Sequence, residues 1–327
     1  MNRSSQFILT VLLGIAVSTC TTKNNETELI LFQADEFHHC TEMLDEAVIN
    51  DFFSPPVASR IYGYSYITAH EVLATLDSVL VPLSGQLHDL TPLPYPENRK
   101  LIHPQLSSMW AFSIVGKSLV YSESILDSLQ SDLSSSAIES GIDQSMLQAS
   151  VEYAQTCADH MLNWMDGDNY KKMRSWDIFT PSVDSPGAWI PTPPDYFDAL
   201  EPHWTKLRTL VIDSASQFRP APPTPFSLDE GSPFYLENIE VYEAVLGNDS
   251  DRIHIAKFWD DAPFQPKVAG HAITGEKKLT PPGHWLSIVR NACKHDTLAF
   301  NDVVEVYCLT SLAMFDAIIS CWYAKYH

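Results

Sequence analysis

The sequence predicts an all-α protein, a helical bundle interrupted by one proline-rich irregular excursion. Over most of the chain, apolar residues recur with the i, i+3, i+4 spacing of helices that bury one face. No strand-rich block and no alternating βα pattern appears. About half of the 22 prolines lie between residues 179 and 226, and proline is incompatible with the interior of a helix.

The first helix is expected from about residue 34, where five apolar side chains share one face: Phe37, Cys40, Leu44, Ala47 and Val48. The letters "SPP" then break it, and Pro56 is well placed to begin a second helix. The apolar positions of this second helix are Ile61, Tyr64, Val72, Leu76 and Leu80. Further helical patterns cover residues 106–129, 144–164, 236–245, 251–258, 285–293 and 300 onwards.

Two stretches between these helices lack the helical pattern of apolar residues. The Ser-rich letters "LSSSAIESGIDQS" indicate a turn region between the third and fourth helices. The prolines of "TPSVDSPGAWIPTPPDYFDALEPHW" and "FRPAPPTPF" indicate extended or turn-like backbone that crosses the surface of the bundle.

Composition limits the classes of partner. The 327 residues include 41 acidic and 20 basic side chains, a formal net charge of −21. Such a surface repels phosphate backbones, so we expect no nucleic acid partner. It also disfavours anionic membrane surfaces unless a lipid anchor holds the protein there.

The N-terminus predicts export. Arg3 precedes a short apolar run that is typical of a signal peptide, and the sequence turns polar at "VSTC". These letters indicate a lipoprotein signal over residues 1–19, lipidation of Cys20, a tether over 20–33 and a helical domain over 34–327. We expect a periplasmic or cell-surface, lipid-anchored protein; a plain secretory signal is the alternative.

Five further cysteines show no CxxC pairing: Cys40, Cys157, Cys293, Cys308 and Cys321. Cys308 and Cys321 lie in a helical apolar pattern, so they are expected to be small buried hydrophobic residues rather than disulfide partners.

Short catalytic motifs are missing, including HExxH, GxSxG and the phosphate-binding glycine loop. His38, His39 and Glu42 have the spacing of helical metal ligands, yet we interpret them as a solvated polar face and expect no metal site. His271 and His284 lie in Gly- or Pro-containing loops, with no partner evident from the sequence.

The final helix carries a buried stripe at helical spacing: Val304, Tyr307, Cys308, Ser311, Leu312, Phe315, Ile318, Ile319 and Trp322. Lys325 follows Trp322 by three residues, so its ammonium is expected to project from the same inward face. The alternative is that the bundle ends there and Lys325 reaches into water.

Several blocks, in order, resemble the bacterial vanadium-dependent haloperoxidases, in the superfamily of type 2 phosphatidic acid phosphatases. They are "DFFSPPVASRIYGYSYITAHE", "GAWIPTPPDYFDALEPHWTKLRTLVIDSASQFRP", "RIHIAKFWDD", "TPPGHW" and "AFNDVVEVYCLTSLAMFDAIISCWYAKYH". The resemblance implies the family's helical bundle, with vanadate as cofactor and hydrogen peroxide and a halide as substrates.

The family's anion pocket has three segments: a Lys followed after six residues by Arg-Pro, then Ser-Gly-His, then an Arg followed shortly by His. Lys325 matches the first residue, and Trp322 matches an aromatic that often precedes it. In "FWDD", Asp260 or Asp261 resembles an acid that pairs with a vanadate-binding Arg; a loop or N-cap acid is the alternative. The remaining segments do not occur in these 327 residues, so we expect a C-terminally truncated member with an incomplete site.

Three functions stay open on this resemblance. The first is vanadate-dependent haloperoxidase, favoured by the long proline-rich block. The second is a phosphatase that hydrolyses phosphate esters through a phosphohistidine. The third is a non-catalytic all-α periplasmic lipoprotein. We expect the chain as it stands to be inactive alone, and its exposed apolar surface could support oligomers.

Overall fold

The computed structural model describes residues 31–182, 186–193, 196–247, 249–262, 264–269 and 272–327. The predicted signal peptide and Cys20 therefore lie outside the described residues. The elements are α1 (Ala34–Asn50), α2 (Pro55–Leu76), η1 (Arg99–Leu101), α3 (Pro104–Leu119), α4 (Glu123–Glu139), α5 (Gln144–Asp166), α6 (Tyr170–Met173), η2 (Trp204–Lys206), α7 (Pro233–Leu246), α8 (Ser250–Phe258), β1 (Phe264–Ala269), β2 (Ala272–Lys277), α9 (Pro281–Asp296) and α10 (Phe300–Tyr326).

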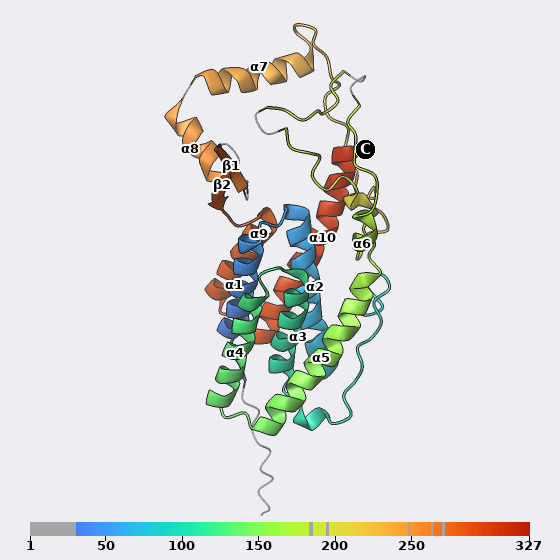
Figure 1. Ribbon diagram of the computed structural model, residues 1–327, viewed down its shortest axis with the longest axis vertical. Coiled ribbons are helices and arrows are strands. Elements are labelled where there is room, and N and C mark those ends of the chain that lie inside the picture. Colours follow the sequence, from blue (N-terminus) through green and yellow to red (C-terminus); the bar gives the residue numbers. More distant parts are fainter. Residues whose placement is uncertain (1–30, 183–185, 194–195, 248, 263, 270–271) are drawn as a thin grey trace, which may run out of the picture.

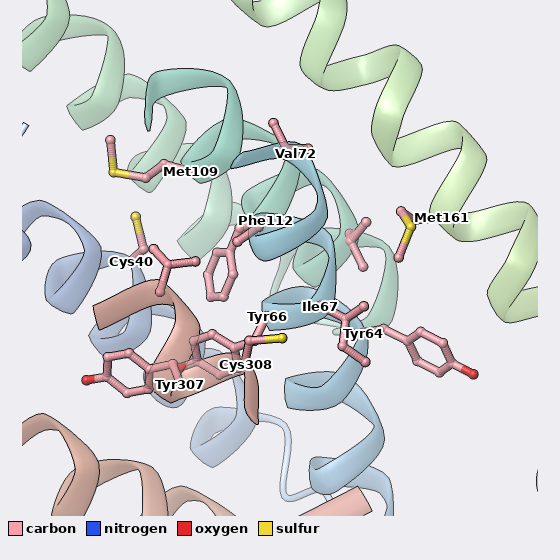
Figure 2. Close-up of a cluster of buried hydrophobic side chains, with 14 of the residues drawn as sticks. Cys40, Tyr64, Tyr66, Ile67, Val72, Met109, Phe112, Met161, Tyr307 and Cys308 are labelled. Atoms are coloured by element: carbon pink, nitrogen blue, oxygen red, sulfur yellow. The ribbon is translucent and has the colours of Figure 1, made fainter. Parts of the chain in front are cut away.

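Helix α2 forms the centre of the bundle and packs against α3, α10, α5 and α9 (Figure 1). It is buried over almost its whole length, so apolar side chains lie on every side of it rather than on one face. Its close approach to α10 depends on Gly63, where a Cβ atom would lie 2.9 Å from the ring of Phe315. The core is aromatic: Tyr66 of α2 stacks on Tyr307 of α10 at a centroid distance of 5.1 Å, beside Phe112 of α3 (Figure 2).

The predicted first and second helices are confirmed as α1 and α2, and all of their predicted apolar positions are buried. Leu80 is an exception in its place, because α2 ends at Leu76 and Leu80 lies in the turn that follows. The single helix predicted over 106–129 is wrong, because α3 and α4 are separated at residues 120–122. The carboxylate of Asp51 accepts hydrogen bonds from the backbone N–H of Tyr121 and Ser122, at 2.6 and 2.9 Å, and so fixes this break from another helix.

The Ser-rich turn prediction is also partly wrong. Residues 133–139 continue α4, because Leu133 and Ala137 lie on its buried face, and only residues 140–143 form the connection. The predictions over 144–164, 236–245, 251–258, 285–293 and 300 onwards are confirmed as α5, α7, α8, α9 and α10.

The proline-rich excursion over 179–226 contains no α-helix among its described residues, as predicted; η2 is its one helical turn there. After it, α7 and α8 stand away from the bundle (Figure 1), and none of their described residues is buried. They lead into the antiparallel hairpin β1–β2, in which Ala269 pairs with Ala272. The sequence reading did not predict this hairpin; otherwise the helical fold class is confirmed.

Cysteine burial follows the prediction at Cys308 but not at Cys321. Cys308 is fully buried, whereas Cys321 is exposed because α10 extends past the bundle at that turn. The described cysteines are all unpaired thiols. By length and composition α10 could cross a membrane, but in the bundle it packs against α2, α9 and α1.

Candidate functional site

The C-terminal turns of α10 are held by one backbone carbonyl of the excursion. Trp322 Nε1 and Tyr326 Oη both donate hydrogen bonds to the carbonyl oxygen of Leu200, at 2.9 and 2.8 Å. The ring of Tyr326 also packs edge-on against Phe179, with centroids 5.3 Å apart. Burial, with the carboxylate of Glu201 as a smaller cause, raises the pKa of Tyr326, so its hydroxyl stays a proton donor.

Asp316, in the middle of α10, binds a later part of the same proline-rich excursion, residues 210–212. Its carboxylate is buried and accepts three backbone N–H groups, from Leu210 at 2.8 Å, Val211 at 2.7 Å and Ile212 at 3.0 Å. A carboxylate that accepts several N–H groups forms strong, charge-assisted bonds. The segment around the end of α10 is therefore fixed at two levels, by Asp316 and by the Leu200 carbonyl.

A buried ion pair supports this end of the bundle. Arg60 Nε of α2 lies 2.7 Å from Asp168 Oδ2 after α5, and both side chains are almost fully buried. Tyr64 Oη donates to the same carboxylate at 3.0 Å, and the Arg60 guanidinium lies over the Tyr170 ring at 4.2 Å. Arg208 of the excursion bonds the backbone carbonyl of Asp168 through its own N–H at 3.0 Å. The pair thus joins α2, α5 and the excursion.

Lys325 lies on the last turn of α10 and is exposed, so the expectation of an inward ammonium is wrong. Its Nζ lies 4.9 Å from the Trp322 ring centroid and 5.7 Å from that of Tyr326, in cation–π geometry. The physical reason is that α10 extends beyond the helices that cover it. Ile319 is its last buried residue, and Lys325 lies further along the helix. Trp322 is half-buried and forms the base on which the ammonium rests.

A second cation near this turn points elsewhere. Arg219 lies over the Tyr323 ring at 5.9 Å, and His327 stacks on Tyr323 with centroids 4.6 Å apart. Residues two apart on a helix do not face each other, so Tyr323 and Lys325 are on different sides of α10. Among the described residues at the end of α10, the guanidinium of Arg219 and the ammonium of Lys325 therefore do not point toward one common site.

The acids of "FWDD" lie in the loop between α8 and β1. Asp260 Oδ2 lies 3.6 Å from Lys278 Nζ, and its other oxygen accepts the N–H of Ala262. Asp261 contacts His284 Nδ1 at 2.8 Å. His284, in the first turn of α9, therefore has the carboxylate partner that the sequence did not reveal. The structure does not bring either acid into a described contact with Lys325.

The polar face predicted for His38, His39 and Glu42 is wrong at His38. This side chain is buried, and its Nδ1 lies 3.0 Å from Tyr307 Oη, while burial lowers its pKa. His39 pairs with Asp132, and Glu42 with Arg290. Across the described parts of the chain, no group of three His, Cys, Asp or Glu side chains could hold a metal ion. His271 is outside the described residues.

Comparison with known proteins decides the family. No family model and no curated protein matches the sequence. Among solved structures, the crystal structure of the first bacterial vanadium-dependent iodoperoxidase matches at 38% identity and a TM-score of 0.82, over 91% of this chain and 70% of that chain. The chain belongs to the vanadium-dependent haloperoxidase family.

The described residues do not by themselves fit a vanadate. An oxyanion with several charged oxygens is held by several converging cationic and N–H donors in a site that excludes water. At this end of the haloperoxidase bundle, Lys325 is an exposed ammonium on an aromatic base, and Arg219 is directed to another side of the helix. No catalytic step through vanadate follows from these residues alone.

The sequence reading missed the residues that build this end of the molecule. Asp316 interrupts the apolar stripe of α10, and a carboxylate inside such a stripe is a signal for a buried acceptor. Arg60 is the one basic Lys or Arg side chain in a helix whose residues are mostly apolar, aromatic or small, which is a comparable signal. Their partners, Asp168 and Leu210, are more than 100 residues away and carry no such signal.

Proposed function

We propose that this chain is the helical scaffold of an exported haloperoxidase that oxidises halide with hydrogen peroxide in a vanadate-dependent reaction. The observation that supports the proposal is the match to the iodoperoxidase, whose identity of 38% extends over 91% of this chain. Iodide is accordingly the first halide to test. Bound vanadate would supply the activation of peroxide.

In this proposal Lys325 is one cationic contact to the anion, positioned by the rest of the described turn. Trp322 supports its ammonium, and the Leu200 carbonyl fixes Trp322 and Tyr326. An exposed Lys–anion contact contributes only about 0–1 kcal/mol, because water solvates both partners. The 327 residues alone are therefore expected to bind vanadate weakly and to show no turnover.

The test compares two chains. The 327-residue chain is assayed for iodide and bromide oxidation with vanadate and peroxide, and for phosphate-ester hydrolysis. A second chain carries the family's Arg-Pro, Ser-Gly-His and Arg–His segments after His327 and is assayed alongside. Vanadate-dependent halide oxidation by the longer chain alone, without phosphatase activity, supports the proposal.

Lys325→Ala in the longer chain tests the role of this lysine. Activity should fall at least tenfold, and Lys100→Ala, an exposed lysine in η1, serves as the matched control. Turnover by the 327-residue chain would contradict the incomplete site. Ester hydrolysis without halide oxidation would replace the haloperoxidase function by the phosphatase alternative.

We further propose that the protein is anchored through lipid on Cys20 and faces away from the cytoplasm. The short apolar run that ends at "VSTC" supports this localisation.

A further inference from the structure

Helices α7 and α8, together with Trp259 after α8, form an arm that stands away from the bundle and carries a large apolar surface (Figure 1). Nine apolar side chains of the arm are 40–73% exposed: Leu236, Val241, Tyr242, Val245, Leu246, Ile253, Ile255, Phe258 and Trp259. Together they expose on the order of 1,000 Å² of apolar surface. The largest apolar patch on a typical monomer is about 300–600 Å², so the arm exposes more than an uncovered surface usually does.

The two helices of the arm are too short to be stable in water without a cover. Isolated helices below about 12–15 residues are marginal, and a helix in a protein is stabilised chiefly by packing of its apolar face. Helix α7 has 14 residues and α8 has 9, and none of those described is buried. Val241, Tyr242 and Val245 lie on one face of α7 at helical spacing. This face therefore needs a partner.

The arm is attached at both ends, so its apolar face is held in a defined place. At the start of α7, the ring of Phe234 packs against Phe226 of the excursion, with centroids 5.1 Å apart. After α8, Asp261 binds His284 of α9 at 2.8 Å. Between these two attachments, the described residues of the arm form no ion pair with the bundle.

The charges of the two helices are complementary. Helix α7 carries three glutamates and no basic residue: Glu237, Glu240 and Glu243. Helix α8 carries Arg252 and Lys257 against a single acid, Asp251. Among the described residues, Glu243 has no ion-pair partner, and Arg252 has only Asp249, at 3.9 Å. Complementary charges at the edge of an interface select the partner and fix its register, so α7 matches α8 of another copy.

A second copy of the chain also matches the arm in area. A two-fold axis repeats every contact, so α7 of each copy would lie on α8 of the other. A standard protein interface buries about 800 Å² on each partner, which the apolar surface of the arm can supply. The three glutamates of α7 disfavour an anionic lipid surface as the cover.

We propose that the arm is the interface through which two copies of this chain associate, with α7 of one copy packed against α8 of the other. The proposal concerns association only, so it goes beyond halide oxidation and does not depend on it.

The experiment measures the oligomeric state of the purified 327-residue chain by sedimentation equilibrium. All samples carry Cys20→Ser, so that no lipid drives association, and contain about 0.15 M salt, which screens charges more than about 8 Å apart. A dimer with a dissociation constant in the micromolar range or below is expected. Val245→Glu should weaken the dimer at least tenfold, because it places a charge in an apolar interface.

The fold should survive this substitution, since Val245 is 73% exposed. The thermal midpoint of Val245→Glu, measured at a dilution where both chains are monomeric, should therefore equal that of the unsubstituted arm. Leu309→Glu, on an exposed position of α10, and Phe218→Glu, in the apolar groove beside α10, are the matched controls. Both should change the dissociation constant less than twofold.

Charge reversal tests which helices face each other. Glu243→Arg and Arg252→Glu should each weaken self-association at least fivefold, because each sets like charges of α7 and α8 against one another. A mixture of the two variants should regain nearly the original affinity, because both contacts of the mixed dimer again join opposite charges. Pairing of α7 with α7 would leave Arg252→Glu unaffected, and contacts within one copy would not recover on mixing.

Several results would overturn the proposal. A chain that stays monomeric at about 100 µM would do so, since interfaces of this size reach micromolar dissociation constants. So would a Val245→Glu chain that dimerises as tightly as the original, or charge variants that do not recover on mixing. The remaining outcomes name another cover. A monomeric longer chain with α7 and α8 protected from hydrogen exchange would assign it to the chain itself, and binding to phosphatidylcholine vesicles that Val245→Glu abolishes would assign it to lipid.

Discussion

Replacement of Asp316 by alanine tests whether this carboxylate fixes the excursion to α10. It removes the acceptor of three backbone N–H groups, at 2.7 to 3.0 Å. Hydrogen bonds to charged groups contribute about 1.5–3 kcal/mol each, but an N–H that can reach water recovers part of this. Leu210 is fully buried, whereas Val211 is 49% exposed. The expected loss in the free energy of unfolding is therefore about 2–4 kcal/mol, well below the sum of three full bonds.

The assay is urea denaturation, combined with hydrogen exchange of the three amides. Asp316→Asn keeps one carbonyl oxygen as an acceptor but places an NH₂ group against a backbone N–H. Its free energy of unfolding should therefore fall by about half as much as that of Asp316→Ala. Asp302→Ala, in the first turn of the same helix, is the control; it removes only a favourable helix-dipole interaction, about 0.3–1 kcal/mol. A loss below about 0.5 kcal/mol for Asp316→Ala, with unchanged exchange at 210–212, would refute the reasoning.

Three further predictions concern other parts of the chain. Burial raises the pKa of Asp45 to about 7, although the hydrogen bond from Tyr62 opposes the shift. Folded Asp45 thus keeps a proton that the unfolded chain releases above pH 4. The free energy of unfolding should therefore fall by on the order of 4 kcal/mol between pH 4 and pH 7. Asp45→Asn should make the free energy of unfolding, measured by urea denaturation, less dependent on pH over this range. Gly63→Ala should cost about 1–3 kcal/mol, because the new methyl group would meet the Phe315 ring; an unchanged thermal midpoint would contradict the close packing of α2 on α10. Cys20→Ser should remove a lipid mass and detergent partitioning, and a wild-type protein without lipid in mass spectrometry would disprove the anchor.

Local patterns were sufficient for most helices. In α1 the apolar residues recur at helical spacing and all reach the core, and Pro55 and Pro56 at the start of α2 agree with the N-terminal preference for proline. The excursion was predictable for an equally local reason, since its prolines lack amide donors. In each of these cases the residues that decide the structure are near neighbours in the sequence.

Features made by distant residues were not predictable in this way. The break between α3 and α4 has no Gly or Pro, and it depends on the Asp51 carboxylate about 70 residues away. The same holds for the contact of His284 with Asp261, 23 residues apart and on separate elements. Lys325 was misplaced because the heptad-like stripe of α10 continues past the point where neighbouring helices cover it. Periodicity shows which face is apolar, but not where along the helix the cover ends.

The length of α10 has a consequence for the export proposed above. Its 27 residues extend over about 40 Å at 1.5 Å per residue, enough to span the hydrocarbon core of a bilayer. A secretion channel opens sideways to segments of this kind and releases them into lipid. Asp316 lies near the middle of the helix, and an ionised aspartate at mid-bilayer opposes that release by about 2.5–3.5 kcal/mol. If the chain is exported as proposed, the carboxylate that binds Leu210, Val211 and Ile212 in the folded protein would also favour passage of α10 through the channel over retention in the membrane.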